Sequence, residues 1–174
     1  MMSTTTKRIT IAVVFQLCWF LLIGLADTAY SVYSTTLAFG VSMVILFKFH
    51  ERTLIWPMLL CALMGFSFDL AMSAFGVISI TDAVIVHNLW LLAIWLLFVA
   101  SYHFLFFWTS NLPSAVIALL GAAGGIASYY AASVLGAVTI LSMNSFLVVY
   151  GVFWAALFLV GKNILVARQL TRVR

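Results

Sequence analysis

Asp69 is an acidic residue inside a long apolar stretch, which makes it the strongest candidate for chemistry in this chain. A carboxyl group in the hydrocarbon core of a membrane is costly and usually faces the interior of a helix bundle. Cys61, Gly65 and Ser73 share its four-residue spacing, which predicts a strip of small and polar side chains facing other helices. Asp69 could contact an ion, a proton or a substrate, or it could be a hydrogen-bonded carboxyl group that holds two helices together. Both alternatives stay open.

Two further groups of polar residues share helix faces. Gln16 and Asp27 are eleven residues apart, about 20° around a helix, so both should face one neighbour. Gln16 is the more typical interhelical hydrogen-bonding residue, whereas Asp27 also fits an exposed helix end. Asn88, Trp95 and His103 share a face of a later helix. A single intramembrane histidine is more often a packing residue than a metal ligand or a catalytic group.

The histidines and cysteines do not form a metal-binding pattern. His50, His87 and His103 are expected at three different depths, and there is no HxxxH, HExxH or paired CxxC motif. Cys18 and Cys61 lie in apolar stretches and are expected to be buried thiols. The sequence also lacks a glycine-rich phosphate loop and a nucleophile elbow. We therefore expect no metal and no cofactor.

The composition requires a membrane to position these residues. The chain has 174 residues, of which 66% are hydrophobic and 7% charged, whereas about a quarter of a soluble domain is charged. Continuous apolar stretches near the length of a spanning helix predict an all-α, polytopic membrane bundle in one integral-membrane domain, 1–174. A transmembrane β-barrel would show short alternating segments instead. The expected spans are 9–26, 29–49, 54–76, 86–108, 113–134 and 140–165.

Six spans place every basic residue on one side of the membrane, and the positive-inside rule makes that side the cytoplasm. Both termini are then cytoplasmic, in an inner membrane. The net charge of +4 is thus explained by orientation, and no nucleic-acid partner is expected. The loop 77–86 on the outer side is mostly apolar, and it could lie on the membrane surface or dip back into the bundle. The basic residues are Lys7, Arg8, Lys48, Arg52, Lys162, Arg168, Arg172 and Arg174.

Small residues and polar residues suggest where helices pack and where a ligand binds. Gly121 and Gly125 form a GxxxG motif, for which packing within the chain is favoured over a homodimer or a membrane-protein partner. The outer half collects most of the polar groups, which predicts a small polar pocket open toward the outside. These groups are Asp27, Tyr30, Asp69, Asp82, His87, Asn88, Tyr129 and Asn144.

The chain resembles a family of bacterial inner-membrane proteins, domain of unknown function 2878, over most of its length. The resemblance rests on Phe15-Gln16 with Trp19, Gly65-x-x-x-Asp69, Gly76-Val77, Leu89-Trp90, Trp95-x-x-Phe98, His103, Trp108, Leu120-Gly121-x-x-Gly124-Gly125, Tyr129 and Gly136-Ala137. The chain departs from the family pattern at Leu89 and Ile126, where prolines are common. The resemblance implies a small multi-span protein without an established activity, and loosely implies neighbours concerned with fatty-acyl modification.

Three functions are compatible with these observations. The protein could bind or move a lipid-like small molecule, with membrane lipids as its partners. It could be a lipid-modifying enzyme that uses Asp69 or His103 as acid or base, although helical rise separates the two by more than about 10 Å in depth. It could also be a structural subunit of a membrane complex. A transporter with inverted repeats is less expected, because the first three and last three spans show no repeat.

Overall fold

The computed structural model describes residues 3–80 and 88–171, with the backbone alone for 166–171. The described part is an all-α helical bundle, as the sequence predicts. Its elements are α1 Thr4–Leu25, α2 Ser31–Phe49, α3 Arg52–Ala74, β1 Ile78–Ile80, α4 Leu89–Leu105, η2 Phe107–Asn111, α5 Ser114–Val134, β2 Val138–Ile140 and α6 Met143–Thr171.

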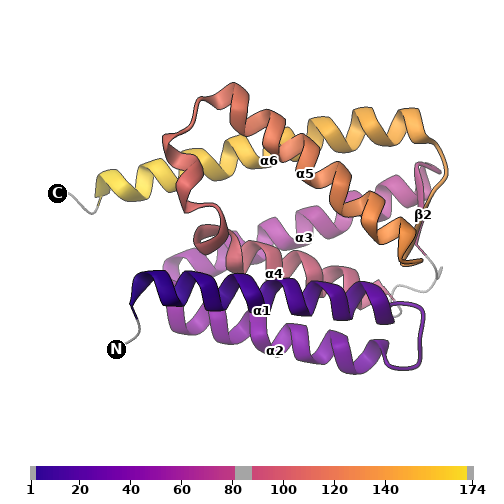
Figure 1. The fold of residues 1–174 in the computed structure, drawn as a ribbon, viewed down its shortest axis with the longest axis horizontal. Helices are drawn as coiled ribbons and strands as arrows, with labels where there is room; N and C mark the ends of the chain where they lie inside the picture. Colours follow the sequence, from indigo (N-terminus) through magenta and orange to yellow (C-terminus); the bar gives the residue numbers. More distant parts are fainter. Residues whose placement is uncertain (1–2, 81–87, 172–174) are drawn as a thin grey trace.

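The helices run roughly along one axis, with α1 and α2 on one side and α5 and α6 on the other (Figure 1). The two short strands lie at one end of the bundle, which we call the strand end. Helix α1 begins and α6 ends at the opposite end, which we call the terminal end. Helix α4 packs against α1, α2 and α3, and nine of its 17 residues are buried, so it is the central helix.

Five of the described helices, all except α4 and the short η2, are long and apolar enough to cross a membrane. Helix α4 is shorter than the predicted span 86–108, because it ends at Leu105 and the one-turn helix η2 follows. At 1.5 Å per residue it is about 25 Å long, a little less than the hydrocarbon core. The protein is therefore a multi-pass membrane protein, and a sixth crossing by α4 stays a prediction.

The loop predicted at 77–86 begins as strand β1, which pairs antiparallel with β2. Strand β2 occupies the residues just before α6, so the predicted span 140–165 begins as a strand and becomes helical only at Met143. Val77, Ile78 and Val138 are buried, which means that protein covers this non-helical backbone. Asp82 and His87 lie outside the described residues.

The two strands reveal an internal repeat. Residues 59–80 and 119–140, sixty positions apart, each form the second part of a helix, a glycine turn and a strand. Both turns have a glycine with positive φ, 70° at Gly76 and 84° at Gly136, a conformation that favours glycine. The cap bonds also match, since Val77 N–H donates to Met72 O and Ala137 N–H to Ala132 O. The identical pairs include Leu59/Leu119, Leu60/Leu120, Ala62/Ala122, Gly65/Gly125, Ala71/Ala131, Ser73/Ser133 and Ile80/Ile140.

The register of the strands is symmetric about the pair Ser79–Thr139, which are equivalent positions of the repeat. A local two-fold axis therefore relates the strands, and α3 and α5 both lead from the terminal end toward them (Figure 1). The first three and last three helices still show no repeat. The repeating unit instead starts at α3, so that α3–β1–α4 corresponds to α5–β2–α6.

Candidate functional site: a buried carboxylate beside an aromatic pocket

The Asp69 carboxylate is completely buried and accepts three hydrogen bonds from three other helices. The indole Nε1–H of Trp95 on α4 and the hydroxyl of Tyr129 on α5 both donate to Oδ2, each at 2.6 Å. The hydroxyl of Tyr150 on α6 donates to Oδ1 at 2.9 Å. One side chain of α3 thus joins α4, α5 and α6 at the centre of the bundle.

Two glycines allow the tryptophans of this site to pack against helix backbone. A Cβ at Gly65 would overlap the indole ring of Trp95, and a Cβ at Gly125 would overlap that of Trp154. The two indole rings stack on each other with centroids 5.3 Å apart and an interplanar angle of 14°. Gly65 and Gly125 are equivalent positions of the repeat, so each half contributes one glycine and one tryptophan to the same stack.

The chemical capacity of Asp69 follows from its partners. All three are neutral donors, and none of them is His103, so the hydrogen bonds of Asp69 do not form an acid–base dyad with that histidine. Within residues 3–80 and 88–171, no three His, Cys, Asp or Glu side chains come together as they would around a metal ion. The arrangement fixes the rings of Trp95 and Tyr129, and both rings line a pocket.

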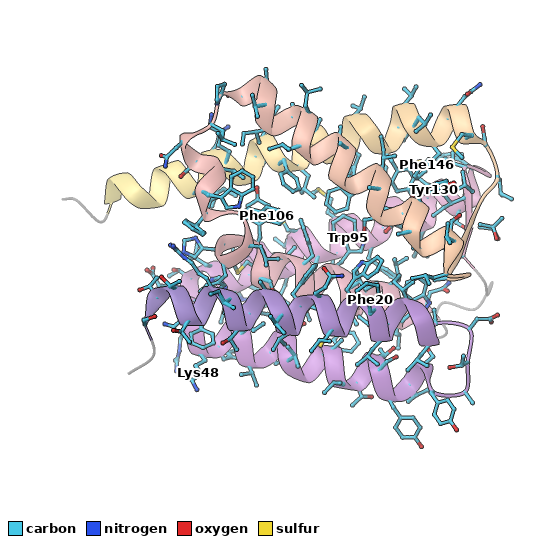
Figure 2. All side chains as sticks on the ribbon, viewed as in Figure 1. Phe20, Lys48, Trp95, Phe106, Tyr130 and Phe146 are labelled. Atoms are coloured by element: carbon cyan, nitrogen blue, oxygen red, sulfur yellow. The ribbon has the colours of Figure 1, made fainter. Side chains whose placement is uncertain are left out.

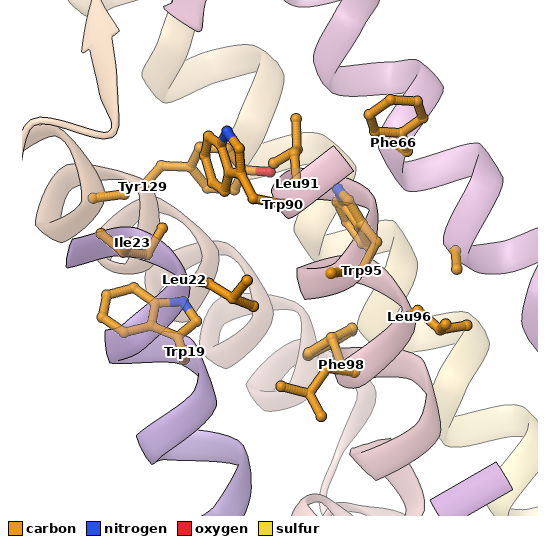
Figure 3. Packing of buried hydrophobic residues seen from close by; sticks show 14 of the residues in the cluster. Trp19, Leu22, Ile23, Phe66, Trp90, Leu91, Trp95, Leu96, Phe98 and Tyr129 are labelled. Carbon is orange, nitrogen blue, oxygen red and sulfur yellow. The ribbon is translucent and has the colours of Figure 1, made fainter. Parts of the chain in front are cut away.

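The pocket has a volume of about 420 Å³ and lies among α1, α4, α5 and α6. Figure 3 shows Trp19, Ile23, Trp90 and Tyr129 near one another, where α1 approaches α4 and α5. Most lining residues are aromatic or aliphatic: Phe15, Trp19, Ile23, Trp90, Leu91, Ile94, Trp95, Phe98, Phe106, Trp108, Leu120, Tyr129, Ala132, Val138, Trp154 and Phe158. Gln16, Thr109, Gly124, Gly125 and Ser128 complete the lining.

The pocket is elongated along the bundle and opens between α1 and α5. Its lining on α5 runs from Leu120 to Ala132, about 18 Å at helical rise. Figure 2 shows Trp95 near the middle of the molecule and Phe106 toward the terminal end. Gln16, Leu120 and Gly124 line the pocket and are exposed in the middle of their helices. The opening therefore faces the depth that lipid chains occupy.

The structure brings together some of the residues predicted from the sequence. Asp69 and Trp95 are hydrogen-bonded, and Gln16 and Trp95 line the same pocket. Asn88 is buried directly before α4, two residues from the pocket residue Trp90. His103 lies near the end of α4, with its ring edge-on to that of Phe104.

Asp27 is exposed in the turn between α1 and α2 and lies outside the site. Conversely, sequence reasoning missed Tyr150, Trp154 and the pocket role of Trp90. The pattern that could have revealed Tyr150 is its phenol inside the last apolar stretch, because a buried hydroxyl there needs a hydrogen-bond partner.

Gly121 and Gly125 both face α6 of the same chain. A Cβ at Gly121 would come within 2.7 Å of the backbone oxygen of Trp154 and 2.8 Å of the Phe158 side chain. These glycines allow α5 and α6 to approach closely, as small residues do between membrane helices. Binding of a second copy or of a partner through this motif stays an untested prediction.

The fold and the site define a multi-pass helical membrane protein with a carboxylate-centred hydrogen-bond cluster beside an aromatic pocket. A family model described as "Protein of unknown function (DUF2878)" matches residues 8–160. The chain belongs to this family, which confirms the resemblance drawn from the sequence motifs. No curated protein and no solved structure matches the chain.

Proposed function

We propose that the protein binds a lipid-like amphiphile in the pocket between α1 and α5. The observation that carries this proposal is the opening of an elongated, mostly apolar pocket at the depth of lipid chains. A volume of about 420 Å³ is within the range of small-molecule sites, which are typically apolar with a few placed polar groups. Asp69 supports the binding surface indirectly, because its hydrogen bonds hold the rings of Trp95 and Tyr129.

We also infer that the protein resides in a bacterial inner membrane with its terminal end in the cytoplasm. Lys7 and Arg8 lie in the first turns of α1, Lys48 in the last turn of α2 and Arg52 at the start of α3, all at the terminal end. Lys162 on α6 donates to Leu112 O, just before α5 begins at the same end. The positive-inside rule favours this end as the cytoplasmic one. A reporter fused to the C-terminus should then fluoresce as green fluorescent protein and stay inactive as alkaline phosphatase, and the reverse result would contradict the orientation.

Blocking the pocket tests the binding proposal. Gly124 lines the pocket, and a Cβ built there meets no atom within 4 Å, so Gly124→Phe should place a ring at the pocket opening without displacing backbone. Gly40 on α2 also has open space around it but lies outside the pocket, so Gly40→Phe is the matched control. Both variants and the wild type would be purified in detergent, and their bound lipids identified by native mass spectrometry.

The expected result is a lipid that copurifies with the wild type and with Gly40→Phe and is at least tenfold depleted in Gly124→Phe. Equal lipid in all three proteins, with equal thermal unfolding midpoints, would overturn the proposed function. If Gly124→Phe unfolds while Gly40→Phe stays folded, Leu120→Trp serves as the blocking variant instead, since Leu120 also lines the opening and is 41% exposed.

A further inference from the structure

The lining of the pocket carries no charge. Among the described residues that line it there is no Asp, Glu, Lys, Arg or His. Asp69 lies behind Trp95 and Tyr129 and is itself fully buried. Arg8, at the terminal end, stacks its guanidinium 3.3 Å from the centroid of the Phe107 ring. Moving a charged group into an apolar site without a partner is costly, so the part of a ligand inside this pocket should be uncharged.

The polar groups of the pocket divide into occupied and unoccupied donors. Trp95 and Tyr129 donate to Asp69, Trp108 donates to Leu105 O at 3.0 Å, and Thr109 donates to Phe106 O at 2.7 Å. All four donors are therefore satisfied by the protein and are not available to a ligand. The lining also contains Gln16, Ser128 and Trp154, and the Nε1 of Trp154 has no partner in the described residues but is fully buried.

Trp19 and Trp90 differ from these four satisfied donors. Their side chains are 9% and 3% exposed, both line the pocket, and neither indole N–H donates a hydrogen bond within the described part of the chain. A buried indole N–H usually has a partner, and it can only donate. Unlike the Nε1 of Trp154, those of Trp19 and Trp90 are not among the fully buried unsatisfied atoms. A ligand in this uncharged pocket that pairs with them needs an uncharged acceptor, for which a carbonyl oxygen is the ordinary chemical group.

The positions of these donors orient the ligand. Trp90 is the second residue of α4 and therefore lies at the strand end, and Trp19 is six residues, about 9 Å, from the end of α1 on the same side. Toward the terminal end the pocket continues between Phe98, Phe106 and Phe158. A ligand that matches this arrangement has its hydrogen-bond acceptor at the strand end, near the two indoles, and its hydrocarbon chain toward the terminal end.

We propose that the pocket selects an uncharged lipid whose carbonyl oxygens accept hydrogen bonds from Trp19 and Trp90 and whose chain extends toward Phe106. This inference rests on the proposed function and specifies its ligand class. Two lipid sources supply this chemistry: an acyl ester of glycerol and a prenylated quinone.

The test uses the full-length protein in detergent and titrates defined probes by native mass spectrometry. Dioctanoylglycerol and a diprenylated naphthoquinone supply the carbonyl, the dioctyl ether of glycerol lacks it, and dioctanoyl phosphatidate adds a charge. Trp19→Phe and Trp90→Phe remove one N–H each and keep an aromatic ring. Trp56→Phe is the control, since Trp56 is 72% exposed on α3 and lies outside the pocket.

The wild type should bind at least one carbonyl probe about fivefold or more tighter than the ether, and bind phosphatidate more weakly than dioctanoylglycerol. Trp90→Phe and Trp19→Phe should each remove most of the preference for the carbonyl, whereas Trp56→Phe should keep it. The tighter of the two carbonyl probes identifies the source, and either one supports the proposal.

Equal binding of ester, quinone and ether to the wild type would overturn the carbonyl assignment and leave the proposed amphiphile binding intact. Tighter binding of phosphatidate than of dioctanoylglycerol would also overturn it. Retention of the carbonyl preference by both Trp90→Phe and Trp19→Phe would overturn the assignment of these donors. If no probe binds the wild type and no lipid copurifies with it, the proposed function fails together with this inference.

Discussion

The halves α3–β1–α4 and α5–β2–α6 have the same backbone plan and carry different polar residues at the centre. Each half places a tryptophan against a glycine, Trp95 on Gly65 and Trp154 on Gly125. Four residues after its glycine, the first half has Asp69 and the second has Tyr129. The two equivalent side chains meet, because the hydroxyl of Tyr129 donates to Asp69.

The two stacked tryptophans also differ in hydrogen bonding. Trp95 donates its indole N–H to Asp69, whereas the buried Nε1 of Trp154 has no hydrogen-bond partner in the described residues. In the second half the corresponding position is Tyr129, whose hydroxyl donates to Asp69 and does not pair with Trp154. The Asp69 carboxylate thus accepts hydrogen bonds from residues of both halves. The halves share a backbone plan, but their polar interactions are asymmetric.

The halves also differ in what covers them. Helix α4 packs against α1 and α2, whereas α5 shares the pocket with α1 and is exposed there at Gly124. The first half therefore supplies the buried centre of the protein, and the second half supplies the accessible side of the site.

Removing the shared carboxylate should have the largest effect. Asp69→Ala leaves Trp95, Tyr129 and Tyr150 without an acceptor, and interhelical hydrogen bonds in membranes contribute about 0.6 to 1.7 kcal/mol each. The free energy of unfolding should fall by about 2–5 kcal/mol, measured by titration with SDS in mixed micelles.

Asp69→Asn is the matched control for charge. Its amide oxygen can accept from Trp95 and Tyr129, and its amide nitrogen can donate to the hydroxyl of Tyr150, so we expect a loss below about 1 kcal/mol. A loss in Asp69→Asn as large as in Asp69→Ala would show that the negative charge, rather than hydrogen-bond geometry, stabilises the centre.

Two adjacent glycines provide the next comparison. Gly125→Ala places a Cβ in the indole ring of Trp154 and should cost about 1–3 kcal/mol through overpacking. Gly124→Ala meets open space and should leave the free energy of unfolding unchanged or raise it by up to about 1 kcal/mol. The same SDS titration measures both, and equal losses would contradict the packing of α5 on α6.

The smallest expected effect is the difference in the free energy of unfolding between Trp95→Phe and Trp154→Phe. Trp95→Phe and Trp154→Phe remove similar ring area, but only Trp95 loses a hydrogen bond and leaves Asp69 with one donor fewer. Trp95→Phe should therefore destabilise the protein by about 1 kcal/mol more than Trp154→Phe. A larger loss in Trp154→Phe would mean that its N–H has a partner that the repeat does not explain.

The sequence alone was sufficient for the membrane class and for the importance of Asp69. Long apolar stretches need no tertiary information, because the bilayer sets the length of a spanning helix. Asp69 could be identified from the sequence because a carboxyl group inside a membrane span needs polar interactions with other helices. Gln16 and Trp95 were also identified from their helix faces, and both line the pocket.

Only the tertiary structure decided which helices meet at Asp69 and where the pocket opens. Helical periodicity defines a face but not the neighbour that covers it, so Tyr150, 81 residues away from Asp69, could not be paired with it in advance. The repeat was hidden for a related reason: lipid-facing positions need only be apolar, so the two segments keep the same residue at few positions, among them the turn glycines Gly76 and Gly136. The symmetric pairing of β1 with β2 shows that the two halves occupy equivalent positions in the fold.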